Sequence, residues 1–175
     1  SPSISCIFLP SKDNAGRIYK RENLMAYFPI FINVENVKVL VIGLGCIAAR
    51  RINVLKNFGA EITVITKEVK TNVENIDIKI KEFEEDDIKE IYDIVIAATD
   101  NNAVNKNIIK LAKEKNIKYY NSISDKNDNN FFFPAVIEND EIVCGLTSKN
   151  GLNHKIAKQY ADILRNTLCV EKKAE

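Results

Sequence analysis

The sequence has almost no excess charge, few cysteines and a single histidine. Lys and Arg number 25 against 24 Asp and Glu, a net charge of +1, so no strong field favours nucleic acid or an anionic membrane as a partner. The 4 cysteines form no CxxC pair, and together with only 1 His they argue against a disulfide framework and a structural zinc site. We therefore expect no metal and a reducing, cytoplasmic location.

Long apolar runs are missing as well. No run approaches the roughly 20 residues that a membrane-spanning helix needs, and residues 1–35 lack the hydrophobic segment of a secretory signal, so we expect no membrane partner. The 175 residues suit one domain, or one domain with a small appendage, and can bury a real core. Residues 1–24 mix Ser, Pro and charges without a period, which predicts a disordered extension ahead of Met25.

From residue 37 onward, short apolar strands alternate with helical patterns. Strands are predicted over 37–42, 61–66, 76–83, 93–98 and 118–123, and helices over 46–58 and 104–115. Short connections between strand and helix imply parallel pairing with right-handed crossovers. Residues 25–124 are therefore expected to form a doubly wound, Rossmann-like α/β domain around a parallel sheet.

The end of the chain has a different pattern. Two β runs, 131–137 and 141–147, are separated by the polar turn 138–140, which is typical of a hairpin. Apolar residues then recur every fourth position, at Leu152, Ile156, Tyr160, Leu164 and Leu168, which predicts one amphipathic helix within 149–175. A hairpin and a lone helix cannot form a core alone, so we expect region 125–148 to mediate a homodimer through the 131–147 hairpin.

A G-x-G-x-x-A motif over residues 43–48 follows the first predicted strand and opens the first helix. Gly43 permits the tight turn, Gly45 lets the backbone approach a pyrophosphate, and the alanine allows close packing of helix on strand. The N–H groups at the helix start, at Cys46 and Ile47, are then expected to bind phosphate oxygens, with the Cys46 side chain buried and inert. The alternative is a tight turn whose glycines serve packing only.

The end of the second predicted strand lacks the acid that usually binds the adenosine ribose of NAD. It reads Thr66-Lys67-Glu68, in which Glu68 comes two residues late and Lys67 is compatible with a 2′-phosphate. These residues leave NAD and NADP both open, although we expect all three to contact the cofactor. Thr99, at the end of a later strand, is expected to lie against the cofactor, or with Asp100 to cap the next helix.

Several motifs together resemble the precorrin-2 dehydrogenase domain of siroheme synthases. They are Tyr27-Phe28-Pro29-Ile30-Phe31, the glycine motif with Arg50-Arg51, Ala97-Ala98-Thr99-Asp100 with Val104-Asn105, and Phe131-Phe132-Phe133-Pro134-Ala135. The resemblance covers about residues 25–168. It implies NAD-dependent oxidation of precorrin-2 to sirohydrochlorin, and a homodimer formed through the hairpin region. Some members of this family also insert ferrous iron, but with one His and no ligand cluster we expect no ferrochelatase activity here.

The resemblance also suggests catalytic residues. The glycine-rich loop of the family falls on residues 43–48, with Leu44 where the family has its middle glycine. The family's essential Asp, in an N-V-x-D stretch, falls on Ser124 when counted from Asn121 without gaps, and on Asp125 after a one-residue shift. We expect Asp125 to act as the acid/base or orienting group. The alternative is an aspartate that serves the turn.

Polar residues near the end of the sheet are candidates for binding the carboxylates of the substrate. Lys126, Lys149 and Asn153 are the residues expected to do so, although they could equally be solvated surface groups. His154 replaces a proline of the family and is expected to be a surface or capping residue. Two other functions remain open: an NAD-binding regulatory module, and a catalytically impaired relative that binds a tetrapyrrole, which Ser124 favours.

Overall fold

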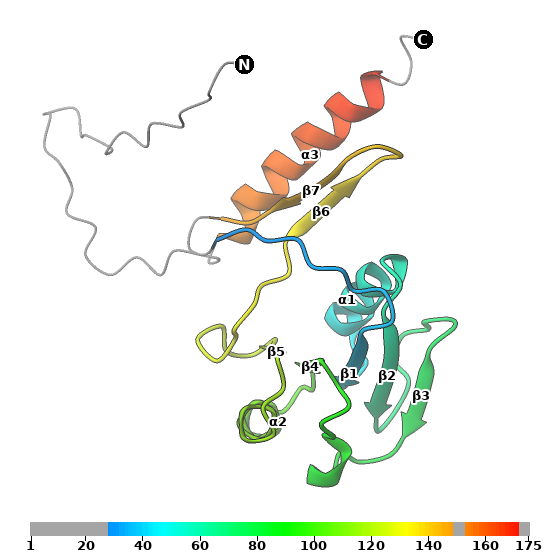
Figure 1. The fold of residues 1–175 in the computed structure, drawn as a ribbon, viewed down its shortest axis with the longest axis vertical. Coiled ribbons are helices and arrows are strands. Elements are labelled where there is room, and N and C mark those ends of the chain that lie inside the picture. The colour runs from blue at the N-terminus through cyan, green and yellow to red at the C-terminus, as the bar shows by residue number, and fades with distance from the viewer. Residues whose placement is uncertain (1–27, 149–152, 172–175) are drawn as a thin grey trace, which may run out of the picture.

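The structure, a computed structural model, describes residues 28–148 and 153–171. The predicted extension 1–24, the substrate candidate Lys149 and the expected helix residue Leu152 lie outside the described residues. The elements in chain order are β1 (Lys38–Ile42), α1 (Cys46–Asn57), β2 (Glu61–Thr66), β3 (Asp77–Ile80), the 3-10 helix η1 (Glu85–Asp87), β4 (Ile94–Ala97), α2 (Asn102–Glu114), β5 (Tyr119–Ser122), β6 (Ala135–Glu138), β7 (Val143–Leu146) and α3 (His154–Glu171). Figure 1 shows them as a sheet with its helices, and a hairpin with α3 beside it.

The main sheet has five parallel strands in the order β3-β2-β1-β4-β5. The chain builds outward from β1 to one edge, then crosses back to the other side of β1 at β4. This reversal opens a crevice at the carboxyl ends of β1 and β4, where open α/β sheets bind ligands. The predicted doubly wound, Rossmann-like fold is confirmed.

Each central strand buries both of its faces. In β1, Val39 and Val41 pack toward α1, whereas Leu40 and Ile42 pack toward α2. All four are at most 1% exposed. Because side chains alternate across a strand, a continuous apolar run between two helical layers is what a parallel sheet requires. The two helices therefore cover opposite faces of the sheet.

The edge of β5 is covered by two asparagine side chains rather than by another strand. Asn129 accepts a hydrogen bond from the Ser122 N–H at 2.5 Å, and Asn130 accepts one from the Tyr120 N–H at 2.8 Å. Side-chain partners of this kind satisfy the unpaired backbone groups of an edge strand. They also hold the following chain alongside β5.

This arrangement corrects the predicted start of the hairpin. The strand expected from residue 131 begins only at Ala135, as β6. The preceding Phe131 and Phe133 instead pack against the α1 side of the sheet, where the ring of Phe131 lies edge-on to Tyr119 with centroids 6.0 Å apart. The prediction was wrong because the alternating pattern did not reveal that the first domain needs these rings to close its core. Likewise, β3 is shorter than the predicted 76–83.

The hairpin of β6 and β7 carries α3 on one side (Figure 1). Ile137 of β6 and Ala161 of α3 are buried there, and the Arg165 guanidinium donates to the Val136 carbonyl at 3.1 Å. The predicted hairpin and amphipathic helix are thus confirmed as elements. Within the described part of the chain, no helix is both long and apolar enough to cross a membrane.

Candidate functional site

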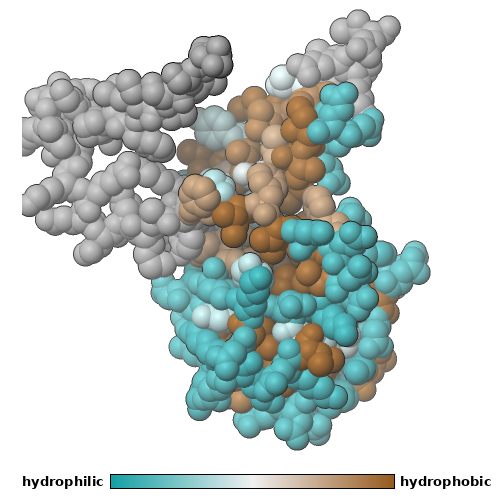
Figure 2. All heavy atoms as spheres, in the orientation of Figure 1, coloured by the Kyte–Doolittle hydropathy of each residue, from teal (hydrophilic) through white to brown (hydrophobic). Residues whose placement is uncertain are grey.

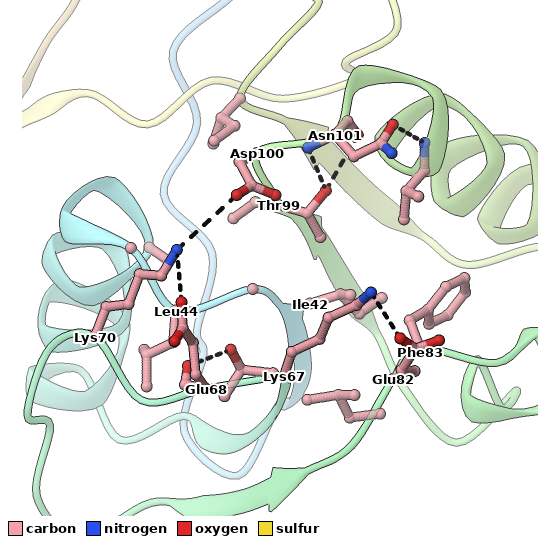
Figure 3. Close-up of a pocket in the computed structure, with 18 of the residues that line it drawn as sticks. Ile42, Leu44, Lys67, Glu68, Lys70, Glu82, Phe83, Thr99, Asp100 and Asn101 are labelled. Carbon is pink, nitrogen blue, oxygen red and sulfur yellow. Dashed lines mark hydrogen bonds and ion pairs between the residues drawn. The ribbon is translucent and has the colours of Figure 1, made fainter.

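A cavity of about 1030 Å³ opens at the carboxyl ends of the strands. Its walls come from the β1–α1 turn, the ends of β2 and β4, the β3–η1 connection and the start of α2 (Figure 3). All the predicted cofactor-contact residues line it: Gly43, Gly45, Cys46, Ile47, Thr66, Lys67, Glu68 and Thr99. Segments distant in sequence therefore meet where the topology predicts a ligand.

The two glycines of the β1–α1 turn have different functions. Gly43 has a φ of +96°, and a Cβ there would lie 2.4 Å from the carbonyl oxygen of Ala98 at the end of β4. This glycine is therefore required by the fold. A Cβ on Gly45 would meet no protein atom within 4 Å, so it would project into open space. Gly45 thus leaves room for a ligand to approach the backbone.

The start of α1 fits a phosphate group. Gly45 is the N-cap, without a side-chain cap hydrogen bond, and the first turn of α1 carries no acidic residue. Gly45, Cys46 and Ile47 all line the cavity. Free N–H groups and the positive end of a helix dipole together bind anions such as a pyrophosphate. The residues at this turn therefore fit the pyrophosphate of a dinucleotide.

Two side chains in this turn, Cys46 and Leu44, have different surroundings. Cys46 is exposed, so the expectation of a buried thiol was wrong: the first position of α1 faces the cavity rather than the core. Leu44, in the family's middle-glycine position, is only 3% exposed and joins the core on the α1 side. Because its side chain turns inward, the glycine loop stays open to the cavity.

The capping of α2 also differs from the prediction. The cap is Asn101, whose side chain accepts from the N–H groups of Ala103 at 2.9 Å and Val104 at 3.2 Å. The expectation that Thr99 and Asp100 might cap this helix was wrong, because Asn101 occupies the N-cap position itself. Thr99 lies two residues before this cap. Its hydroxyl accepts from the Asn101 N–H at 3.2 Å and donates to the Asn105 side chain at 2.7 Å.

Asn105 was missed as a site residue. It is fully buried; its Oδ1 accepts from the Thr99 hydroxyl at 2.7 Å and N–H at 3.0 Å, and its Nδ2 donates to the Thr99 carbonyl at 2.9 Å and to the Ser124 hydroxyl at 3.3 Å. One amide therefore ties the end of β4 to the residues after β5. A buried polar residue on an apolar helix face was the available signal.

Ion pairs surround the mouth of the cavity. The Lys67 ammonium lies 2.8 Å from a Glu82 carboxylate oxygen (Figure 3). Lys70 lies 2.8 Å from Glu68 and 3.9 Å from Asp100. The hydrogen bond and charge of Glu82 raise the pKa of Lys67, and Lys67 in turn lowers the pKa of Glu82, so both are charged at neutral pH.

Glu82 and Lys70 were absent from the predicted set. The signal for Glu82 was its position at the end of the third predicted strand, 76–83, because the carboxyl ends of parallel strands lie at one edge of the sheet. Nothing in the sequence pattern indicated that Lys70 would reach the cavity.

The predicted catalytic residues lie just outside the cavity lining. Ile123 lines the cavity, and Ser124 follows it. The Ser124 hydroxyl shares a hydrogen bond of 2.9 Å with Ser122. Asp125 accepts from the N–H of Asn127 at 2.9 Å, which is the turn contact that the alternative interpretation anticipated. Neither residue is part of the cavity lining, and local hydrogen bonds engage both.

Basic groups from three elements gather near the start of α3. Burial, followed by the charges of Lys126, Arg50 and Arg51, lowers the pKa of His154, the first residue of α3. Burial and the charge of Arg50 lower the pKa of Arg51 to about 10, so Arg51 stays charged at neutral pH. The predicted substrate residue Asn153 accepts from an N–H of α3 at 3.1 Å and so caps the helix.

Arg51 has a positioning role in this region. Its guanidinium donates to the Oδ1 of buried Asn121 at 2.6 Å and lies 4.8 Å from the centre of the Phe133 ring. Asn121 in turn donates to the Phe131 carbonyl at 2.8 Å. This chain of contacts holds α1, β5 and the segment leading to β6 together.

Within residues 28–148 and 153–171, no group of three or more His, Cys, Asp or Glu could hold a metal.

A glycine loop open to a cavity, at the reversal point of a parallel sheet, defines a dinucleotide-binding protein. A family model described as "Putative NAD(P)-binding" matches residues 30–135, and the chain belongs to this family. The predicted nicotinamide dinucleotide cofactor is thereby confirmed.

Similar proteins support a narrower kinship. The chain is 37% identical over 151 residues to the "Probable multifunctional siroheme biosynthesis protein HemA" of Ruminiclostridium josui, a match covering 82% of this chain and 29% of that protein. It is 35% identical over 130 residues to the siroheme synthase of Blochmanniella pennsylvanica (strain BPEN), covering 71% and 27%. The chain thus spans less than a third of these relatives.

A solved structure also matches. "SirC, precorrin-2 dehydrogenase" superposes with a TM-score of 0.68 at 26% identity, over 81% of this chain and 71% of that chain. The resemblance to the dehydrogenase domain of siroheme synthases, predicted from motifs, is confirmed by these matches.

Proposed function

We propose that this chain oxidises precorrin-2 to sirohydrochlorin with NAD. The main support for this proposal is the glycine loop, in which Gly45 leaves the start of α1 open to a cavity large enough for a dinucleotide. The kinship with siroheme synthases and with a precorrin-2 dehydrogenase supports the substrate. NAD, when bound, accepts a hydride from the macrocycle, and one proton is released with it.

The protein's own residues bind and orient the reactants. The first turn of α1 holds the pyrophosphate, and the amide network of Asn105 fixes Thr99 beside it. Asp125, two residues after the cavity-lining Ile123, receives or directs the released proton, and its turn contact with Asn127 orients the carboxylate. Ser124, the alternative in the sequence register of the family, is held toward Asn105 and Ser122.

The basic groups near α3 suit a substrate with many carboxylates. Arg50 and Lys126 supply positive charge, and both contribute to the lowered pKa of His154 at the start of α3. We extend the binding role to Asn153 and Lys149, as the sequence predicted. Charged hydrogen bonds from such groups are stronger than neutral ones and would set the orientation of the macrocycle.

We also propose a homodimer through the hairpin and α3. On α3, Ile156, Tyr160 and Ile163 recur along one side and are 41%, 58% and 51% exposed. Hairpin residues Ile142 and Val143 are 44% and 43% exposed. Figure 2 shows hydrophobic side chains gathered over this part of the molecule, away from the hydrophilic surface around the main sheet. A continuous apolar surface of this kind is typical of an interface.

Turnover by variants tests the catalytic assignment. Protein and freshly generated precorrin-2 are mixed with NAD under anaerobic conditions, and NADH is followed for wild type, Asp125→Asn and Ser124→Ala. Asp125→Asn should lower the rate by about 100-fold or more while NAD binding is unchanged. If Ser124→Ala alone loses turnover, Ser124 has the role. If neither variant loses it, both assignments are wrong.

A charge introduced on the apolar side of α3 tests the dimer. Ile163→Glu should convert a dimer into a monomer in sedimentation velocity, with the same far-UV circular dichroism. Lys158→Glu, at an exposed polar position of α3, is the control and should remain dimeric. A monomeric wild type at micromolar concentration would contradict the proposal.

A further inference from the structure

The end of β2 raises the question of how the site distinguishes NAD from NADP. In this fold, an acid at the tip of the second strand binds the ribose hydroxyls of NAD, and a basic residue there accommodates a 2′-phosphate. The tip here carries Lys67, which by itself favours NADP. We propose that Glu82, from the segment after β3, supplies the missing carboxylate and, together with Lys67, makes the site select NAD. This inference rests on the dinucleotide site proposed above.

The sheet register brings Glu82 to the tip of β2. Thr66, the last residue of β2, pairs with Ile80, the last residue of β3. The next N–H, of Lys81, donates to the Thr66 carbonyl at 2.9 Å, so the chain remains beside β2 for one residue more. Glu82 then stands next to Lys67, and both line the cavity. A carboxylate distant in sequence thereby occupies the region of the usual acid.

The charges at this point act against a 2′-phosphate. Lys67 lowers the pKa of Glu82, so the carboxylate is ionised at neutral pH. A phosphate bound by Lys67 would either displace Glu82 or lie beside its negative charge. By contrast, two ribose hydroxyls can donate to Glu82 while Lys67 remains paired with it. The pair is exposed, so it contributes little to folding stability.

Glu68, the acid that follows Lys67 in sequence, is engaged elsewhere. The Thr66 hydroxyl donates to the Glu68 carbonyl at 2.7 Å, which turns the chain away from the strand direction. The Glu68 side chain pairs with Lys70, which also reaches toward Asp100. Figure 3 shows this group near Leu44, on the other side of the cavity from Glu82. Glu82 is therefore the better candidate for the ribose.

Equilibrium binding of NAD and NADP tests the inference without turnover. Isothermal titration calorimetry on wild type should give at least ~10-fold tighter binding of NAD. Glu82→Gln should reduce this ratio by about tenfold, mainly through tighter NADP binding, because Lys67 is released. Lys67→Gln should bind NADP more weakly than wild type does. Glu61→Gln, at the opposite end of β2, makes the same change in net charge and should leave the ratio unchanged.

The outcomes separate this inference from the proposed function. If wild type binds both dinucleotides equally, or if Glu82→Gln has the same ratio as wild type, the role of Glu82 is wrong while the dinucleotide site stands. If folded wild type binds neither dinucleotide, the proposed function itself is overturned, and the inference with it. Equal melting temperatures of wild type and variants exclude loss of folding as the cause.

Discussion

The two parts of this molecule differ in how completely they bury their own apolar surface. Around the main sheet, the side chains of β1 and β4 are at most 2% exposed, except for Lys38 at the strand start, and helices cover both faces. In the unit of β6, β7 and α3, Ile137 and Ala161 are the residues buried among those whose side chains are described. The side of α3 that carries Tyr160 is open.

The difference follows from architecture. A five-stranded sheet between two helical layers encloses apolar residues on both faces, whereas one hairpin against one helix encloses a single thin layer. The first part therefore forms a closed core of its own, which holds the positive-φ turn at Gly43 in place. The second part contributes surface, and needs either the first part or a second copy to cover it. The predictions below test this contrast.

The largest contrast is between isoleucines of the two parts. Ile96 in β4 and Ile137 in β6 are 0% and 3% exposed. Ile96→Ala should cost about 3 to 5 kcal/mol in urea unfolding, and Ile137→Ala about 2 kcal/mol, because the thin layer can collapse around the lost atoms. If the proposed dimer covers this region, the cost at Ile137 should vary with protein concentration. Equal costs that do not depend on concentration would contradict the contrast.

Within the first part, alanine substitutions at the two glycines should separate an effect on folding stability from an effect on NAD binding. Gly43→Ala should destabilise the protein by about 2 to 3 kcal/mol, since its φ of +96° and the Ala98 carbonyl both oppose a side chain. Gly45→Ala should cost less than about 1 kcal/mol yet weaken NAD binding by about tenfold or more. Thermal melting and calorimetry measure the two effects. A Gly45→Ala variant with normal NAD affinity would argue against the assignment of the loop.

At the junction of the two parts, Arg51→Ala should cost about 2 kcal/mol. It removes a charged hydrogen bond and leaves the buried Asn121 amide oxygen without its Arg51 partner. Arg51→Lys keeps the charge but not the planar group over Phe133, and should recover only part of the loss. Full stability of Arg51→Ala in chemical denaturation would show that the junction does not depend on this contact.

A smaller effect is expected at the start of α2. Asn101→Ala removes the side-chain acceptor for two N–H groups and should cost about 1 kcal/mol. Asn101→Asp, which keeps an acceptor, is the matched control and should be close to wild type. If Asn101→Ala has the same melting temperature as wild type, another group caps the helix.

The smallest effect is a pH dependence at His154. Its pKa lies below the ordinary 6.5, so the unfolded chain takes up the proton more readily than the folded protein. The stability is complete above the unfolded pKa and declines as the pH falls through about 6.5 toward the lower folded pKa. His154→Gln should remove that part of the decline. Identical denaturation midpoints against pH for both proteins would contradict the basic cluster.

The sequence predicted those features that depend on local patterns. The apolar runs of β1 and β4, the glycine motif and the stripe on α3 each have a period or spacing that reflects their structure. Cys46 was misjudged because the pattern places a residue on a helix without saying which side the helix turns to the cavity.

Features that depend on contacts between distant segments were not predictable in this way. Asn129 and Asn130 pair with the edge of β5 and carry the chain past the expected start of the hairpin. Asn105 reaches the site because α2 begins beside the end of β4, and Glu82 does so because the chain after β3 continues beside the end of β2. Side-chain hydrogen bonds of this kind leave no periodic pattern in the sequence. They can be identified only once the order of the strands and helices in space is known.

The proposed oxidation of precorrin-2 with NAD is tested most directly by the stoichiometry of one anaerobic reaction. Wild-type protein is mixed with NAD and precorrin-2, and the absorbances of sirohydrochlorin and NADH are followed together. The account predicts that both appear only with the protein present, one NADH for each sirohydrochlorin. Tight binding of NAD with neither product formed would contradict it, and would leave a dinucleotide-binding protein without this reaction.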